Sequence, residues 1–214
     1  MKTILFQGDS ITDCGRDRGN DANLGNGYPR LIEASLGFDM PGQYRFVNRA
    51  VSGDRVPDVY ARIVRDVLSV RPDVLSLLVG VNDIWHGLDG CNGTGTARFE
   101  KVYDLFLDEV TAELSGVKLL LLEPFLLPGT ATNNRDGQPD RFSVFDSGVK
   151  ELAAIVRRLA DRHDAAFVPL QSAFDAAALR AEPSYWLQDG VHPTAKGHAL
   201  IAHEWRKAFD ALSL

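Results

Sequence analysis

Apolar positions along the chain form two alternating kinds of segment. Five short runs are almost continuously apolar, as expected of strands that are buried on both faces of a sheet. They lie at residues 2–7, 45–51, 73–80, 117–123 and 165–170. Between and after these runs, apolar residues recur at three- and four-residue steps, which is the spacing of one helical face. These amphipathic segments lie at about 27–37, 56–70, 97–115, 144–163 and 194–212.

This alternation predicts a fold of the α/β class. Strands separated by helices pair in parallel, and right-handed crossovers place helices on both faces of the sheet. We therefore expect a three-layer α/β/α sandwich with a flavodoxin-like, five-stranded parallel sheet in the order 2-1-3-4-5. No internal repeat or linker interrupts the pattern, so residues 1–214 are expected to form a single domain.

The charge composition limits the kinds of molecule that the protein is expected to bind. The 214 residues include 23 Lys and Arg against 29 Asp and Glu, a net charge of −6. This balance argues against nucleic acid or an anionic membrane as a partner. The apolar run near the N-terminus is too short for a signal peptide or a spanning helix, so a cytoplasmic location is expected. Cys14 and Cys91 form neither a metal-ligand motif nor a disulfide framework, and no metal or other cofactor is predicted.

Small polar residues follow the first three expected strands. Gly-Asp-Ser stands at 8–10, Ser-Gly-Asp at 52–54 and Gly-Val-Asn-Asp at 80–83. The fourth strand leads into a polar loop at 128–141. Because open parallel sheets bind ligands beyond the carboxyl ends of their strands, we expect these residues to meet at one site.

His192 is the histidine best placed to act as a base. Pro193 disfavours helical geometry at His192 and suits the first turn of the last helix, so His192 belongs to the preceding loop. Asp189, three residues earlier, can accept the imidazole Nδ1–H and fix the tautomer. A serine hydroxyl becomes nucleophilic when an imidazole takes its proton, which makes Ser10 the candidate nucleophile. From these residues alone, a simple turn at Asp189-Gly190 with His192 as a cap is an equally good explanation.

The remaining histidines are expected to have lesser roles. His86 is expected in a glycine-rich loop near the site, and His163 near a helix C-terminus, where a cation suits the helix dipole. His198 and His203 lie on the last amphipathic segment, where they are expected to be surface or packing residues.

An acyl ester attacked by serine develops negative charge on its carbonyl oxygen, and this charge needs fixed donors. Three candidates follow the expected strands: the N–H of Ser10, the N–H of Gly53, which no Cβ obstructs, and the side-chain amide of Asn82. The last two also have ordinary explanations, since asparagine forms turns and glycine adopts positive φ in loops.

Four segments, taken in order, resemble the SGNH (GDSL-type) hydrolase family. They are GDSIT at 8–12, the glycine of NRAVSGD at 48–54, GVND at 80–83 and DGVHP at 189–193. Each is weak alone, but all four occur in order over most of the chain. The resemblance implies a flavodoxin-like sandwich, serine esterase activity and no cofactor.

The same resemblance assigns roles to individual residues. It implies that Ser10 is the nucleophile, that His192 is its base and that Asp189 orients the imidazole. It also implies that Ser10, Gly53 and Asn82 donate to the oxyanion.

Within the family, the motifs look most similar to small acetyl esterases of sugars, such as acetylxylan esterases, and less similar to lipase- and lysophospholipase-like members. We therefore expect hydrolysis of short-chain O-esters of carbohydrates through an acyl-enzyme. Trp85 and Trp186 would either stack on a sugar ring or pack beneath loops, and Asp9 would either brace its loop or contact substrate. Sugar-ester members of the family are often oligomeric, which suggests a homo-oligomer.

Two functions of other classes remain open. Asp9 directly follows a strand and is the candidate nucleophile of a magnesium-dependent phosphatase, with Asp13, Asp17 and Asp54 as nearby carboxylates. The haloacid-dehalogenase pattern, however, expects a second aspartate where Ile11 stands. A non-catalytic carbohydrate-binding protein on the same fold would bind ligand without turning it over.

Overall fold

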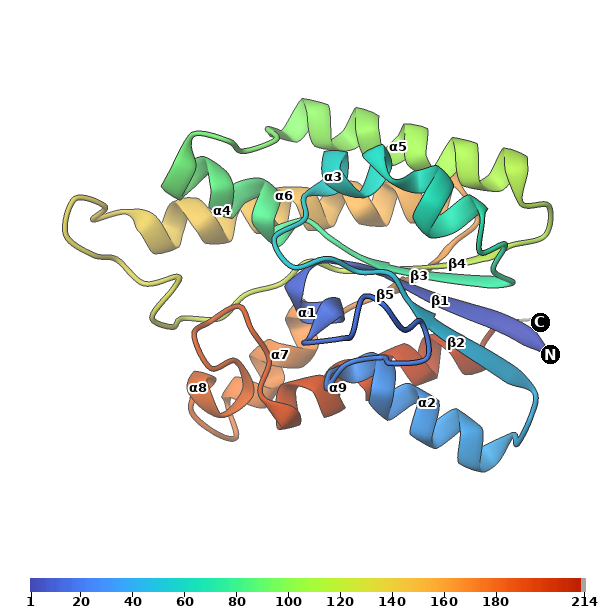
Figure 1. The fold of residues 1–214 in the computed structure, drawn as a ribbon. Helices are drawn as coiled ribbons and strands as arrows, with labels where there is room; N and C mark the ends of the chain where they lie inside the picture. The colour runs from blue at the N-terminus through green and yellow to red at the C-terminus, as the bar shows by residue number, and fades with distance from the viewer. Residues whose placement is uncertain (213–214) are drawn as a thin grey trace.

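A computed structural model describes residues 1–212, and one five-stranded sheet forms its centre (Figure 1). All neighbouring strands pair in parallel, in the order β2-β1-β3-β4-β5. The strands are β1 (Lys2–Gly8), β2 (Tyr44–Asn48), β3 (Val74–Leu78), β4 (Lys118–Leu122) and β5 (Ala166–Val168). The predicted fold class and strand order are therefore confirmed.

Helices cover both faces of the sheet (Figure 1). On one face lie α2 (Tyr28–Asp39), α7 (Gln171–Ala178) and α9 (Ala195–Asp210). On the other lie α3 (Val56–Ala61), α5 (Thr96–Glu113) and α6 (Arg141–Arg162). The shorter elements are α1 (Ser10–Asp13), the π-helix η1 (Val64–Leu68), α4 (Val81–Gly90) and α8 (Pro183–Trp186). Within residues 1–212, no helix combines the length and the apolar character needed to cross a membrane.

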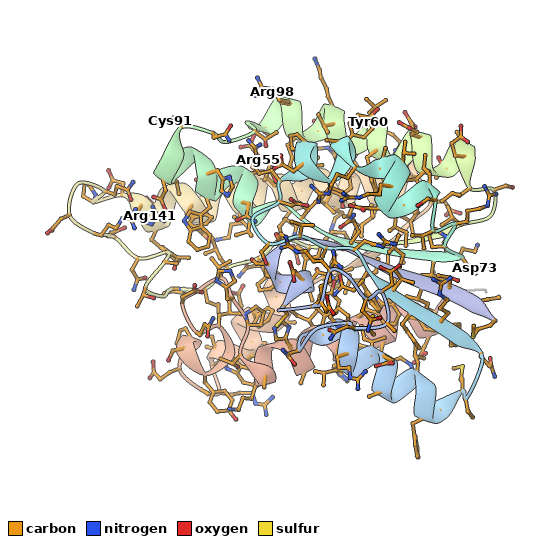
Figure 2. All side chains as sticks on the ribbon, in the orientation of Figure 1. Arg55, Tyr60, Asp73, Cys91, Arg98 and Arg141 are labelled. Carbon is orange, nitrogen blue, oxygen red and sulfur yellow. The ribbon has the colours of Figure 1, made fainter. Side chains whose placement is uncertain are left out.

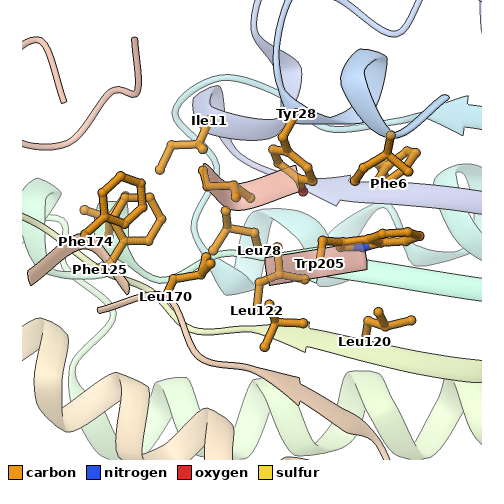
Figure 3. Packing of buried hydrophobic residues seen from close by; sticks show 14 of the residues in the cluster. Phe6, Ile11, Tyr28, Leu78, Leu120, Leu122, Phe125, Leu170, Phe174 and Trp205 are labelled. Atoms are coloured by element: carbon orange, nitrogen blue, oxygen red, sulfur yellow. The ribbon is translucent and has the colours of Figure 1, made fainter. Parts of the chain in front are cut away.

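Each strand contributes to two cores, because successive side chains point to opposite faces. Phe6 and Leu120 pack with Trp205 of α9 on one face (Figure 3). Leu5 and Leu121 pack on the other face, against α3, α5 and α6. Burial on both sides is the physical reason for the nearly continuous apolar runs in the sequence.

Several helices differ from the sequence prediction. The segment after β3, expected to be a loop, is helix α4, although Gly87 and Gly90 weaken its helical propensity. Val81 is buried in the core, and Ile84 packs against it, so tertiary packing outweighs local propensity. The expected helix at 56–70 is instead divided into α3 and η1, and α7 and α8 were not predicted.

Candidate active site

Ser10 lies where β1 ends and α1 begins. Gly8 closes β1 with a φ of +154°, and a Cβ there would lie 2.2 Å from the carbonyl oxygen of Leu78 on β3. Only glycine fits this close approach and adopts this φ without strain. It therefore allows the chain to turn directly from β1 into α1. The Asp9 carboxylate then accepts the Ile11 N–H at 3.0 Å as the N-cap of α1, which fixes Ser10 in the first helical turn.

The loop before α9 brings His192 to Ser10 from 182 positions further along the chain. The Ser10 Oγ lies 3.0 Å from His192 Nε2. The Nδ1–H of His192 donates to Asp189 Oδ2 at 2.7 Å, and the other Asp189 oxygen accepts the backbone N–H groups of Val191 at 2.9 Å and His192 at 2.8 Å. Asp189 is therefore held by three donors, and its carboxylate orients the imidazole.

The protonation states of Asp189 and His192 favour proton transfer from Ser10. Burial raises the pKa of Asp189, but the hydrogen bonds from His192 and Val191 outweigh it and lower the pKa to about 2. The hydrogen bond to Asp189 raises the pKa of His192, against the opposing effect of burial. Because Asp189 accepts the Nδ1–H, the Nε2 lone pair of neutral His192 faces the Ser10 hydroxyl.

These side chains open onto a cavity of about 690 Å³. Its lining consists of Ser10, Ser52, Gly53, Asn82, Trp85, His86, Asp89, Gly90, Asn92 and His192. Within residues 1–212, neither the Ser10 N–H nor the Gly53 N–H donates a hydrogen bond. Asn82 uses one of its two amide hydrogens on the Asp54 carbonyl at 3.0 Å, which leaves the other available. The three expected oxyanion donors thus line one cavity.

Asp13 connects α1 with the loop that carries Gly53. Its Oδ2 accepts the Ser52 N–H at 2.9 Å and the Ser52 hydroxyl at 3.1 Å. Asp13 was considered only as a phosphatase carboxylate, and its role as a brace was missed. Its position three residues after Ser10, on the same short helix, was the available signal.

Two residues that were candidates for substrate contact, Asp9 and Trp186, lie outside the cavity lining. Asp9 is only 1% exposed, because its side chain turns inward to cap α1, and burial raises its pKa to about 7. It does not line the cavity, which also removes the placement that a phosphatase nucleophile would need. Trp186 does not line the cavity either, since it packs against Tyr185 at the end of α8.

Trp85 and His86 lie on α4 and line the cavity, so His86 belongs to a helix and not to the expected loop. Trp85 also packs near His192, with 5.8 Å between ring centroids. Asp89, which also lines the cavity, and Arg141, which is hydrogen-bonded to Asp89, were missed because nothing in their local sequence relates them to the four motifs.

Cys14 lies close to a second histidine but is not poised for nucleophilic chemistry. The Tyr28 N–H donates to His198 Nδ1 at 3.2 Å, so the proton of neutral His198 is on Nε2, which lies 3.4 Å from the Cys14 sulfur. Nε2 therefore donates and does not accept a thiol proton. Burial lowers the pKa of His198 to about 4 and raises the pKa of Cys14, which keeps both groups neutral near pH 7.

One group within residues 1–212 has side chains spaced to hold a metal ion, namely Asp104, Asp108 and His163. None of them lines the cavity. Asp104 already accepts hydrogen bonds from Arg162 at 2.5 Å and His163 at 2.7 Å, so its oxygens have partners. The group is best explained as a set of polar contacts that join the middle of α5 to the C-terminal end of α6.

The profile of the GDSL-like lipase/acylhydrolase family matches residues 6–200, which include Ser10, Gly53, Asn82, Asp189 and His192. The chain belongs to this family. As a GDSL-like acylhydrolase it is a carboxylic ester hydrolase that acts on small-molecule esters.

Individual GDSL-like relatives resemble the chain over nearly its whole length. An acetylxylan esterase of Geobacillus stearothermophilus is 33% identical over 213 residues, covering 93% of this chain and 90% of the relative. The crystal structure of Axe2, an acetylxylan esterase from the same organism, has a TM-score of 0.84 at 28% identity and covers 99% of this chain and 95% of its own. A protein described as a GDSL-like lipase from Parabacteroides merdae has a TM-score of 0.88 at 37% identity, with 98% and 95% covered.

Proposed function

We propose that this chain is a serine esterase that removes acetyl and other short acyl groups from carbohydrates through an acyl-enzyme. The observation that carries the proposal is the hydrogen-bonded line from Ser10 through His192 to Asp189, which opens onto the cavity. A hydroxyl, a neutral imidazole and a carboxylate in this order are the parts that acyl transfer requires.

In the first half of the reaction, Ser10 attacks the ester carbonyl carbon while His192 Nε2 takes the hydroxyl proton. Asp189 stabilises the imidazolium that forms. The carbonyl oxygen becomes an oxyanion that accepts hydrogen bonds from the N–H groups of Ser10 and Gly53 and from the Asn82 amide. His192 then gives its proton to the leaving alcohol oxygen as the ester bond breaks, which leaves the acyl group on Ser10.

In the second half, water takes the place of the alcohol. His192 accepts a proton from the water as its oxygen attacks the acyl carbonyl, and the same donors hold the second oxyanion. The intermediate collapses, the bond to Ser10 Oγ breaks, and His192 returns the proton to Ser10. The products are a carboxylic acid and the regenerated enzyme.

Removal of one oxyanion donor gives a test of this step. Asn82→Ala is expected to lower kcat for p-nitrophenyl acetate by about 10²–10³-fold, because its amide contacts the oxyanion and not the ground-state ester. Steady-state kinetics should show little change in KM. Asn82 also bonds the Asp54 carbonyl, so active sites are counted by fluorophosphonate titration and the melting temperature is measured. A normal kcat per titrated site would contradict the role.

The cavity lining supports a polar alcohol and a short acyl group. Among the described residues that line it, Trp85 is the one large apolar side chain, and the others are glycines or residues with a polar group that can bond a hydroxyl. A sugar offers hydroxyls to such groups and an apolar ring face to an indole. Similarity to the acetylxylan esterases of Geobacillus stearothermophilus supports the same substrate class. A lipase-like substrate would instead need an extended apolar trough for its acyl chain.

An acyl-length series tests the substrate class. We expect kcat/KM for p-nitrophenyl esters to be highest for acetyl and to fall steadily towards dodecanoyl, because the lining residues include one large apolar side chain, Trp85, and form no extended trough for a long acyl chain. Acetylated xylo-oligosaccharides should release acetate, which is measured by a coupled assay with Ser10→Ala as the blank. Preference for octanoyl or longer esters would overturn the substrate class and leave the serine chemistry intact.

A further inference from the structure

The imidazole of His192 has an aromatic neighbour on α4. The Trp85 ring lies 5.8 Å from the His192 ring between centroids, inclined by 51°. Trp85 also packs on Phe145 of α6, with 5.9 Å between centroids. The indole is therefore placed to cover part of the imidazole and to limit how the ring can tilt.

Trp85 is itself held by a hydrogen bond along α4. Its Nε1–H donates to Asp89 Oδ2 at 2.7 Å, and the two residues lie four positions apart, on one face of the helix. Two arginines hold Asp89 in turn. Arg141 contacts both carboxylate oxygens, at 2.6 Å and 3.0 Å, and Arg135 contacts Oδ1 at 2.6 Å. The hydrogen bond from Arg141 is the main reason why the pKa of Asp89 is lowered.

Arg141 is the first residue of α6, and its side chain is 0% exposed although it carries a full charge. Figure 2 shows it at the base of the polar loop, near the end of α4 where Cys91 lies. Besides Asp89, its guanidinium donates from Nε to the Ala131 carbonyl at 2.8 Å and from Nη1 to Gln138 at 2.7 Å. Burial of an arginine is tolerated only when its donors are satisfied in this way.

The polar loop closes the connection back to the triad. The N–H of Ala131, the residue whose carbonyl Arg141 holds, donates to the backbone carbonyl of Asp189 at 2.9 Å. The contacts thus form a closed ring that includes the imidazole. Its members in order are His192, Trp85, Asp89, Arg141, Ala131 and Asp189.

We propose that Asp89 and Arg141 are positioning residues, which hold Trp85 against His192 and tie this wall to the Asp189 loop, so that Nε2 stays aimed at Ser10. This inference rests on the proposed role of His192 as the general base. It gives Trp85 a part in orienting the base, beyond its expected part as a platform for a sugar.

The pKa of His192 depends on nearby charges and on burial, so a pH profile of activity can show whether Trp85 still covers the imidazole. Asp189 and the more distant Asp9 raise the pKa of His192, and burial lowers it, while His198 shares a like-charge interaction with it. If Trp85 moves away, water reaches the imidazole and the depressing effect of burial weakens. The pKa of His192 should then rise, and the acid limb of kcat/KM should move to higher pH.

A double-mutant cycle on p-nitrophenyl acetate tests the proposal, because this substrate is too small to need a sugar platform. Asp89→Asn and Trp85→Phe should each lower kcat by about tenfold, with KM changed by less than about twofold, since misplacement of the base costs rate and not binding. Because Asp89 acts through Trp85, Asp89→Asn should lower kcat by a smaller factor in the Trp85→Phe background than in the wild-type protein. Asp146→Asn, which removes a partly exposed carboxylate of α6 that pairs only with Lys150 of the same helix among the described residues, is the matched control and should be neutral.

Because Asp89→Asn leaves Arg141 without its carboxylate and can prevent folding, Trp85→Phe and Trp85→Ala provide a second route. Trp85→Ala should raise the pKa of His192 measured by ¹⁵N NMR titration, and Trp85→Phe should raise it less. Full kcat on p-nitrophenyl acetate with only a raised KM for acetylated xylo-oligosaccharides, or an unmoved His192 titration in Trp85→Ala, would overturn the proposal. Wild-type protein without Ser10-dependent hydrolysis would refute the esterase mechanism instead, and the titration still decides the positioning role because it needs no turnover.

Discussion

Replacement of Ser10 by alanine is expected to lower turnover of p-nitrophenyl acetate by about 10⁴-fold or more. The Ser10 Oγ is the hydroxyl that lies 3.0 Å from His192 Nε2, and the other nearby nucleophiles are committed elsewhere. The Ser52 hydroxyl donates to Asp13, and the Cys14 sulfur accepts a hydrogen bond from an imidazole that cannot take the thiol proton. Neither can take over the attack on the ester.

Steady-state kinetics on purified protein measure this loss. Ser147→Ala is a matched control, because this exposed serine of α6 bonds only the Val144 carbonyl of its own helix. The control should retain full activity. Ser10→Ala protein with unchanged turnover and an unchanged melting temperature would refute the assignment of Ser10.

Replacement of Asp189 by asparagine is expected to cost about 10⁴-fold in kcat, through the tautomer of His192. The two backbone N–H groups that hold Oδ1 should keep the amide oxygen in that place, which turns the NH₂ group towards His192 Nδ1. Nδ1 must then accept, so the proton moves to Nε2, and the imidazole can no longer take the Ser10 proton. Kinetics give the rate, and ¹⁵N chemical shifts give the tautomer.

Asp189→Asn is also expected to shift the pH profile of the residual activity in a defined direction. Asp189 raises the pKa of His192, so its removal should lower that pKa and move the acid limb of the residual activity to lower pH. Asp161→Asn, on the exposed side of α6, should change neither the rate nor the profile. An acid limb that stays in place, or moves to higher pH, would contradict the assigned pairing of Asp189 with His192.

The sheet and its order were predictable because both depend on local signals and general rules. Strands such as β3 (Val74–Leu78) are buried along their whole length, and the sequence shows this as a run that is apolar except at Ser76. Crossover handedness then leaves few orders for five parallel strands. The positions of Ser10 and of His192 with Asp189 were predictable for a similar reason, since each lies in a short motif that follows a strand or precedes a helix.

Other features depend on contacts that leave no local signal. Asp89 and Arg141 are 52 positions apart, and each alone resembles an ordinary surface charge in the sequence. Helix α4 forms in a glycine-containing segment because the core packs against it. Asp9 was a candidate for substrate contact because it adjoins Ser10, but the turn at Gly8 directs its carboxylate inward to cap α1.

The most direct test of whether His192 activates Ser10 is to expose the protein briefly to a fluorophosphonate and to locate the adduct by mass spectrometry and peptide mapping. An activated serine hydroxyl bonds covalently to the phosphorus, so we predict one adduct per chain on Ser10. We also predict much slower labelling after His192→Ala and none after Ser10→Ala. An unlabelled protein that still hydrolyses acetyl esters, or an adduct on a different residue, would contradict the claim that His192 activates Ser10 for attack.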